Sequence, residues 1–549
     1  MTNVLLSRNQ YIFLFSLLTM VAGAGLYVPL MDNDSAHHAN IALHMYLTGD
    51  YVNLVDNGRD YLDKPHLHFW LSALSYQLFG LTGFAYKFPS FLFSLLAVYA
   101  VYRAGSLFYN RDTGRLSALL LASSLAFLLA LNDVRMEIIL TAGICLAGWQ
   151  LGALILQPNG VNIAGAALGL AIGFSTKGLI GVFVPALAAL LLISQYRKWR
   201  FLLSGRFFLL LIFFFFLISP VLYCYYLQFN LHPEKMIRGR DHINGVSFIL
   251  FGQSVERYTG GMGDTLKNDY FFFLHSFLWV FVPWSVAALF AIANKFRSSL
   301  KTEKEWMSTG VFLLMILLLS FSGFKLPHYL VMLLPFAALF TADWFIGQQN
   351  QRKSLTLIYR IQLFISFLLL LVALLLNFWA FPVSNGWIMA GLVFLLAVFL
   401  HGIRSMIIQP GQKIIFLPVT ATALLFFLLN TNFYPRLLHY QGGSELVFRY
   451  RENFDRKAVY SWKEDISASF QFYTGTLRKQ FPVNRSEAEK PGWLLYYKES
   501  EAEVLKSGLR FGRIFRAADY EITRLDAAFL NPDKRERQCT ELILAEILP

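Results

Sequence analysis

Long apolar stretches alternate with short polar segments over the first 430 residues of the chain. About 17 to 25 apolar residues are enough to cross the hydrocarbon core of a bilayer as a helix. By that measure the pattern predicts about thirteen membrane-spanning helices, and we interpret the first as an uncleaved span. They lie near residues 11–30, 86–102, 116–131, 138–157, 161–176, 178–196, 207–229, 270–293, 307–323, 327–346, 356–380, 386–402 and 414–430.

One further stretch, residues 67–82, is interrupted by polar side chains and is predicted to lie along the membrane surface. Lysine and arginine concentrate in short cytoplasmic loops. If residues 67–82 lie in the interface and do not cross the membrane, the basic clusters of the chain fall on one side. That side is therefore predicted to be cytoplasmic, with the N-terminus. The outer side receives loop 31–85, loop 230–269 and everything after about residue 430.

The last 110 or so residues differ in kind, with scattered charges and short apolar runs at 458–462, 493–497 and 513–525. Runs this short are typical of strands, so residues 431–549 are predicted to form a small α/β soluble domain. Residues 1–430 form the predicted polytopic α-helical membrane domain. The topology places the soluble domain outside the cytoplasm.

Composition supports the membrane assignment, since 56% of the 549 residues are hydrophobic and 15% are charged. Soluble domains carry roughly 25% charged residues. The net charge of +13 follows from basic cytoplasmic loops, which argues against nucleic acid as a partner. Three scattered cysteines offer neither a disulfide framework nor a zinc spacing.

The first outer loop carries Asp32 and Asp34, followed by His37 and His38 in a segment with helical apolar spacing. This pattern predicts an amphipathic helix on the membrane surface that begins near Asp34. In the plainer alternative, Asp34 or Ser35 only caps the helix. The acids and histidines are also ligand types for a divalent metal, but their spacing matches no defined metal motif, so no metal site is assigned.

Cations are unexpectedly frequent on the outer side, where the positive-inside rule predicts few. Lys64 follows Asp63 before a helix start, Lys177 lies in a turn between spans, and Lys325 precedes Pro327. Each lysine alone is explained by snorkelling to the interface. Together with Arg257 in the second wide loop, they predict a cationic lining whose natural counter-ion is phosphate.

These motifs resemble the polyprenyl-phosphate-sugar-dependent glycosyltransferases of the GT-C type, in the aminoarabinose transferase-like branch related to protein O-mannosyltransferases. The resemblance covers nearly the whole chain in the right order. Its motifs are the acidic first loop ending in Asp34, Asp63-Lys64-Pro65, Lys87-Phe88-Pro89-Ser90, Thr176-Lys177-Gly178, and Lys325 with Pro327 and Tyr329. Ser35 and His37-His38 depart from the usual glutamate and Arg-Tyr.

The resemblance implies a GT-C fold and an inverting transfer of a sugar from an undecaprenyl-phosphate carrier. It implies that Asp34 is the catalytic carboxylate, with Glu137 where relatives often carry aspartate. Carrier phosphate would contact Lys64, Tyr329 and, by loop position, Arg257, with Lys325 in the same motif. Asp32, His37, His38, Asp63 and Lys177 are the accessory candidates.

The expected acceptor is a lipid A-like lipid or envelope glycan on the periplasmic face of a bacterial inner membrane. A protein Ser/Thr hydroxyl is the alternative acceptor, and a flippase for an anionic lipid-linked sugar is the competing class. A flippase is less favoured because transporter sites lie midway through the spans. No cofactor is expected beyond the open question of a divalent metal.

Overall fold

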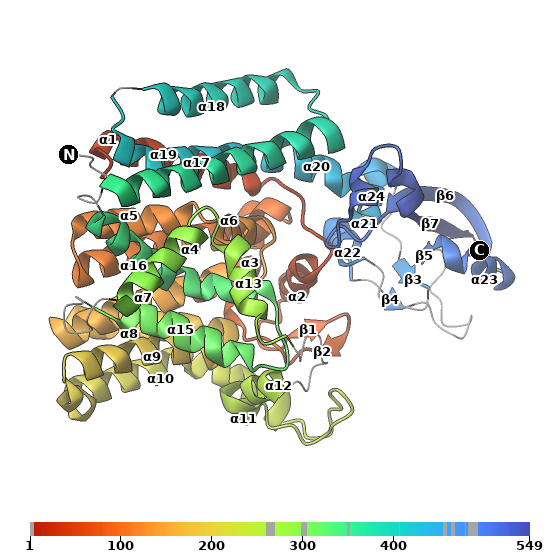
Figure 1. Cartoon of the computed structure of the whole chain (residues 1–549). Helices are drawn as coiled ribbons and strands as arrows, with labels where there is room; N and C mark the ends of the chain where they lie inside the picture. Colours follow the sequence, from red (N-terminus) through yellow and green to blue (C-terminus); the bar gives the residue numbers. More distant parts are fainter. Residues whose placement is uncertain are drawn as a thin grey trace.

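Figure 1 shows the computed structural model, in which a large bundle of helices carries a small β-sheet at one side. The structure describes residues 5–259, 269–297, 305–348, 352–405, 407–453, 458–462, 467–477, 479–480 and 492–548. The sheet and its helices lie beside the end of the bundle that also holds α2 (Asp34–Thr48).

Seven helical segments within the described ranges are long and apolar enough to cross a membrane. A bent pair, α5 (Arg111–Ala122) and α6 (Leu125–Asn132), adds an eighth if it counts as one span. The seven segments are Gly83–Phe108, Glu137–Leu156, Gly205–Asn230, Pro327–Gly347, Ser354–Ala380, Gly386–Arg404 and Pro410–Tyr440. These helices show a polytopic helical membrane protein, and the count of thirteen spans stays a prediction.

The other helices of the bundle are shorter. They include α1 (Arg8–Gly25), α8 (Gly160–Lys177), α9 (Ile180–Gln195) and α15 (Met307–Ser320). The stretch predicted as one span at 270–293 forms two helices, α13 (Phe272–Val280) and α14 (Ser285–Arg297). Pro283 lies in the break, where a proline cannot donate the helical hydrogen bond.

Glycines allow close packing between α7 (Glu137–Leu156), α8 and α9. A Cβ atom added to Gly173 of α8 would lie 2.6 Å from the carbonyl oxygen of Gly181 in α9. A Cβ added to Gly143 of α7 would lie 2.7 Å from the amide nitrogen of Gly173. Small residues let helix backbones approach this closely, so these glycines fix the position of Lys177 at the end of α8.

The first outer loop folds over this bundle. It contains α2, a short hairpin of β1 (Val55–Asp56) and β2 (Arg59–Asp60), and α3 (Leu67–Phe79). With 13 residues, α3 is about 20 Å long, which is too short to cross the hydrocarbon core. This length agrees with the interfacial position predicted for 67–82.

The second wide loop contains α11 (Gly245–Ser247), the π-helical turn η3 (Phe248–Gly252) and α12 (Gln253–Thr259). The Gly323 amide donates a hydrogen bond of 3.0 Å to the Tyr258 carbonyl at the end of α12. The turn before η4 (Pro327–Leu333) and α16 (Leu334–Gly347) therefore lies against the second loop.

The C-terminal sheet has five strands in the order β4-β3-β5-β7-β6. Strand β3 (Ala458–Ser461) is parallel to β4 (Lys479–Gln480) and β5 (Gly492–Tyr497), whereas β7 (Thr540–Leu548) is antiparallel to β5 and β6 (Arg510–Asp519). Helices α21 (Gly442–Tyr450) and α22 (Ala468–Thr474) lie between this sheet and the bundle, and α22 contacts α2.

The remaining helices complete the bundle and the tail. They are α4 (Gly83–Phe108), η1 (Trp199–Leu203), α10 (Gly205–Tyr225), η2 (Tyr226–Asn230), α17 (Arg352–Leu374), η5 (Leu375–Ala380), α18 (Gly386–Arg404), α19 (Pro410–Leu428), η6 (Leu429–Phe433), α20 (Tyr434–Leu437), η7 (Leu438–Tyr440), η8 (Arg451–Asn453), η10 (Lys498–Ser500), α23 (Glu501–Lys506), α24 (Ala527–Leu530) and η11 (Arg535–Gln538).

Candidate functional site

A polar cavity of about 210 Å³ lies where the first outer loop meets the turns between the helices. Its walls come from the start of α2, the segment before α3, the turn before α7, the end of α8 and the turn before η4. It is lined by Asp34, His37, His38, Tyr61, Asp63, Lys64, Arg135, Met136, Glu137, Lys177, Phe324, Leu326, His328 and Tyr329. Eight of the residues singled out in the sequence therefore share one cavity.

Asp34 is the first residue of α2 and lines the cavity. The residue before it, Asn33, caps the helix, so the Asp34 side chain is not used for capping. The Asn33 side chain accepts a hydrogen bond of 2.8 Å from the Ser35 amide, so neither Asp34 nor Ser35 is the cap. Asp34 contacts Arg135 at 3.1 Å, and 51% of its side chain is exposed. A carboxylate free of capping and open to the cavity can approach a substrate.

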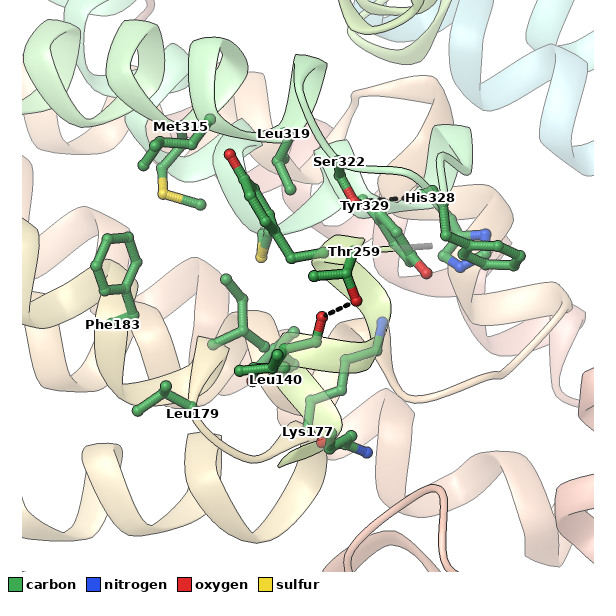
Figure 2. A pocket seen from close by; sticks show the side chains of 18 of the residues that line it. Leu140, Lys177, Leu179, Phe183, Thr259, Met315, Leu319, Ser322, His328 and Tyr329 are labelled. Atoms are coloured by element: carbon green, nitrogen blue, oxygen red, sulfur yellow. Dashed lines mark hydrogen bonds between the residues drawn. The ribbon is translucent and has the colours of Figure 1, made fainter. Parts of the chain in front are cut away.

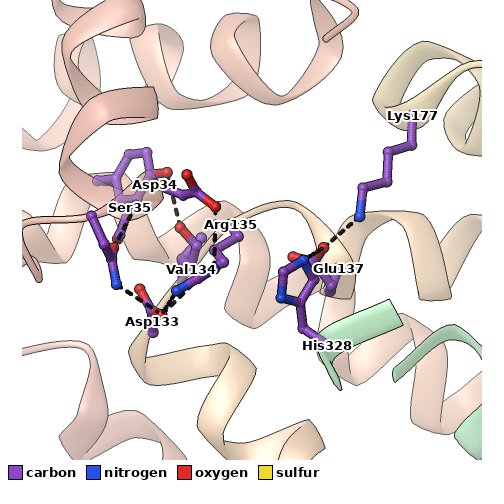
Figure 3. A network of polar contacts seen from close by, with 10 residues as sticks. Asp34, Ser35, Asp133, Val134, Arg135, Glu137, Lys177 and His328 are labelled. Carbon is purple, nitrogen blue, oxygen red and sulfur yellow. Dashed lines mark hydrogen bonds and ion pairs between the residues drawn. The ribbon is translucent and has the colours of Figure 1, made fainter. Parts of the chain in front are cut away.

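Glu137 forms the buried centre of a second group in the same cavity, which Figure 3 shows beside Asp34 and Arg135. Lys177 Nζ donates to Glu137 Oε1 at 2.5 Å, and His328 Nε2 lies 3.5 Å from the same oxygen. Lys177 Nζ also lies 5.1 Å from the centre of the Tyr329 ring. Glu137 thereby holds Lys177 beside His328 and Tyr329.

An apolar cavity of about 420 Å³ adjoins the polar one and shares Glu137, Lys177, Phe324, His328 and Tyr329 with it. Figure 2 shows Phe183, Met315 and Leu319 around this space, with His328 and Tyr329 at one end. Phe183 belongs to α9, and Met315 and Leu319 belong to α15; a further wall comes from α12. The two cavities together form an amphipathic site suited to a lipid with a charged head group.

Neutral histidines make up part of the polar wall. Burial lowers the pKa of His38 well below its usual value, and the neighbouring His37, His68 and Lys64 lower it further. His68 lies outside the lining, in ring contact with His38, and burial likewise lowers its pKa to about 4. The third histidine, His37, has its Nε2 2.8 Å from Asp56 Oδ2 at a partly exposed position. The cationic character of the cavity therefore comes from Lys64, Arg135 and Lys177.

The structure places other predicted site residues at the edge of this cavity or away from it. Asp63 lines the cavity but forms an ion pair with Arg238. Lys325 is buried outside the lining, where its Nζ donates to the Asp269 carbonyl at 3.0 Å. Arg257 belongs to α12, and its side chain lies outside the described residues.

Asp32 points to the C-terminal tail. Its carboxylate accepts hydrogen bonds from Ser467 and Ser469 at 2.5 to 3.1 Å. It therefore contacts residues more than 430 positions later in the sequence and does not line the polar cavity.

Two residues of the site, Arg135 and His328, are not assigned a role by sequence reasoning. Arg135 contacts both Asp34 and Asp133, the latter at 2.9 Å. The sequence feature that could have identified Arg135 is the one that identified the lysines: a cation in a turn on the predicted outer side. His328 lies between Pro327 and Tyr329, inside the motif of Lys325, Pro327 and Tyr329 on which the family resemblance rests.

Within the part of the chain that the structure describes, no three His, Cys, Asp or Glu side chains gather as metal ligands. Glu137 is held by Lys177 and His328, and Asp34 by Arg135. The residues present thus form ion pairs in place of a carboxylate cluster.

Comparison with known proteins identifies proteins that are similar to this chain in sequence and in fold. Residues 63–224 match the family described as dolichyl-phosphate-mannose-protein mannosyltransferase. The chain is 27% identical over 340 residues to undecaprenyl phosphate-alpha-4-amino-4-deoxy-L-arabinose arabinosyl transferase 2 of Pseudomonas fluorescens, a match over 60% of this chain and 57% of that protein. It is 31% identical over 180 residues to the enzyme of that name from Sodalis glossinidius, 31% of this chain and 32% of that protein. The match to the first relative thus spans little more than half of its length.

Among solved structures, ArnT from Cupriavidus metallidurans bound to undecaprenyl phosphate shares the fold, with a TM-score of 0.74 and 14% identity over 98% of both chains. The same protein in the apo state gives a TM-score of 0.70, with 15% identity over 97% of both chains. A fold shared over almost the whole length, with at least seven long apolar helices among the described residues, defines a polytopic helical membrane protein with the fold of ArnT. The family match and the sequence relatives add a similarity in sequence. In the regions they cover, the chain is similar to dolichyl-phosphate-mannose-protein mannosyltransferases and to aminoarabinose transferases.

Proposed function

We propose that this protein is an inverting glycosyltransferase that moves a sugar from an undecaprenyl-phosphate carrier to an acceptor. The observation that carries the proposal is the shared wall of Glu137, Lys177, His328 and Tyr329 between a polar and an apolar cavity. A polyprenyl chain would occupy the apolar cavity, and its phosphate would meet the cations at this wall. The structural neighbour ArnT binds undecaprenyl phosphate, which supports the same carrier here.

The phosphate end of the donor is assigned to Lys64, Lys177 and Tyr329, which line the polar cavity. Charge-assisted hydrogen bonds to the departing phosphate would stabilise the negative charge that develops as the sugar leaves. Arg257 is assigned to the same phosphate by its position in α12, and Lys325 holds the adjoining turn through the Asp269 carbonyl.

Asp34 is assigned to the acceptor. An acceptor hydroxyl oxygen attacks the anomeric carbon, the bond from that carbon to the phosphate oxygen breaks, and the bonding electrons leave with the phosphate. The hydroxyl proton passes to Asp34, a step typically worth about 10² to 10⁴ in rate. Arg135, 3.1 Å from Asp34, directs the carboxylate into the cavity.

Glu137 is assigned a supporting role at the reacting centre. Because it is buried and paired with Lys177 and His328, it fixes the lysine that meets the phosphate. Asp63, His37 and His38 would shape the sugar end of the same cavity.

The proposed acceptor is a lipid A-like lipid or an envelope glycan, as the resemblance to the aminoarabinose transferase-like family implies. The names of the sequence relatives support the undecaprenyl-phosphate-linked donor. A protein Ser/Thr hydroxyl is the second acceptor, favoured by the match of residues 63–224 to protein mannosyltransferases. Movement of the carrier without sugar transfer would instead mark a flippase.

The proposal includes the topology expected from the sequence. About thirteen spans in residues 1–430 place the N-terminus in the cytoplasm and the polar cavity on the periplasmic face of the inner membrane. Residues 431–549, with their five-stranded sheet, form a periplasmic α/β domain.

The decisive experiment supplies purified protein in lipid nanodiscs with undecaprenyl phosphate that carries labelled aminoarabinose. Lipid A and a Ser/Thr-containing peptide are offered separately as acceptors. Label on either acceptor supports the transferase and identifies the acceptor class. In proteoliposomes, carrier movement with no labelled acceptor would overturn the proposal in favour of a flippase.

A further inference from the structure

The segment just before Asp34 is held by the C-terminal tail. The Leu30 amide donates to the Tyr473 hydroxyl at 2.8 Å, and the Leu30 carbonyl accepts from Gln441 at 3.0 Å. The Asp32 amide donates to Gln441 Oε1 at 2.6 Å. Ser467 and Ser469 add their bonds to the Asp32 carboxylate. We call Gln441, Ser467, Ser469 and Tyr473 the loop clamp.

A second set of bonds leads from this segment to the polar cavity. Asn33 Nδ2 donates to Asp133 Oδ2 at 3.2 Å, while Asn33 Oδ1 caps α2. Arg135 bonds to that same Asp133 oxygen and to Asp34. The loop clamp, Asn33 and Arg135 thus fix the backbone on one side of Asp34 and its carboxylate on the other.

The Asp34 side chain alone has little to hold it. Among the described residues its side chain pairs with Arg135, and with half of the Asp34 side chain exposed such an ion pair contributes little. The clamp acts only two residues earlier, at Asp32, so a shift there moves Asp34 almost equally. Misplacement of a catalytic group by about 1 Å can lower a rate about 100-fold.

We propose that Asp32 and Gln441 are positioning residues, through which the C-terminal tail holds Asp34 in its reactive place. This inference rests on the proposed function, because it assumes that Asp34 acts on the acceptor. It gives the tail a part in the reaction although, among the described residues, no tail residue lines the polar cavity.

The tail has other attachments that do not pass through residues 30–33. Arg535 donates to the Ala380 carbonyl at 2.5 Å and lies 3.8 Å from the Phe381 ring centre. Asn40 donates to the Ala468 carbonyl at 2.8 Å, and Phe472 packs against Tyr76. Variants of the clamp should therefore keep the tail docked while they release the loop.

The test measures sugar transfer by the full-length protein in nanodiscs, with Asp32→Ala and Gln441→Ala. Each should lower kcat about 10- to 100-fold and leave the donor KM unchanged, because the phosphate-facing cations are intact. Asp32→Asn keeps an acceptor oxygen for Ser469 and should recover most of the rate. Arg513→Ala, which breaks the ion pair with Glu546 inside the same sheet, is the matched control and should match wild type.

A double variant tests whether the two sides of the clamp act together. Asp32→Ala with Ser469→Ala should be no slower than Asp32→Ala alone, because the Ser469 hydroxyl bond that Ser469→Ala removes is already lost in Asp32→Ala. Wild-type kcat in Asp32→Ala, or a higher donor KM at unchanged kcat, would overturn the proposal.

A second measurement does not depend on activity. Hydrogen exchange at the Leu30 and Asp32 amides should become faster in Gln441→Ala, while the helical amides of α2 keep their protection. Unchanged exchange at both amides would overturn the clamp even if transfer is confirmed. If wild type transfers no sugar, the proposed function fails, and exchange still decides whether the tail holds the loop.

Discussion

Glu137 and Lys177 are the most deeply buried ion pair of the site, with 6% and 10% of their side chains exposed. Removing one partner of such a pair leaves an uncompensated charge, which costs about 3 to 5 kcal/mol. Replacing both partners by uncharged groups of similar size costs much less. Stability and activity should therefore respond differently to changes at these two positions.

We expect Glu137→Gln to lower the thermal midpoint of the purified protein strongly, and the double variant Glu137→Gln with Lys177→Met to recover most of that loss. Sugar transfer should stay low in both, because the phosphate loses Lys177 or its orientation. Thermal unfolding in detergent and the transfer assay would measure the two effects. A double variant with wild-type transfer would exclude both residues from the site.

Asp34 and Lys64 give the second prediction at this scale. Asp34→Asn should lower kcat about 10² to 10⁴-fold, because the acceptor hydroxyl loses its base. Lys64→Ala should nearly abolish transfer by removing a phosphate contact. Asp241→Asn, an exposed acid of the second outer loop, is the matched control for Asp34→Asn. Normal membrane insertion of all three would show that the loss is chemical, and wild-type turnover by either site variant would remove that residue from the site.

The residue types of the site could be read from the sequence, but their pairings could not, and the sides of the membrane stay a prediction. Asp34, Lys64, Lys177 and Tyr329 share a cavity, as expected if their loops lie on one face. The contact of Asp34 with Arg135 joins residues 101 positions apart, so it depends on how the helices pack. The position of Lys325 outside the lining is likewise set by tertiary structure.

At the scale of helices, close packing of α7, α8 and α9 fixes where Lys177 and Glu137 meet. The long apolar runs of the sequence predicted the positions of these helices well, because the bilayer thickness sets how many apolar residues such a helix needs. Bends and breaks were harder to predict. The 52° bend between α5 and α6 and the break at Pro283 fall inside runs that look continuous in hydropathy.

The glycine contacts give a prediction for this scale. Gly173→Ala should destabilise the protein by about 1 to 3 kcal/mol, because the new Cβ meets the Gly181 backbone. Gly148→Ala on α7 is the matched control, since nothing lies within 4 Å of its Cβ position. It should be neutral or slightly stabilising through helix propensity. Thermal unfolding of both variants in detergent is the measurement, and equal midpoints would contradict the packing argument.

At the scale of the whole molecule, the topology can be tested directly. We expect a reporter that is active only in the periplasm to work when inserted after residue 508, in the turn between α23 and β6. The same reporter should be silent after residue 198, because basic residues keep that loop in the cytoplasm. The opposite pattern would invert every assignment of sides. Activity at both sites would mean that the span count has the wrong parity.

The loop clamp joins residues that are synthesised at different times, since Asp32 and Gln441 are 409 positions apart in the sequence. At a synthesis rate of about 5 to 20 residues per second, Gln441 leaves the ribosome about 20 to 80 seconds after Asp32. During that interval the nascent chain already holds its first helices in the bilayer, yet Asp34 has no clamp. A chain whose tail has not yet been translated should therefore transfer carrier-linked sugar at least about 10- to 100-fold more slowly than the finished protein.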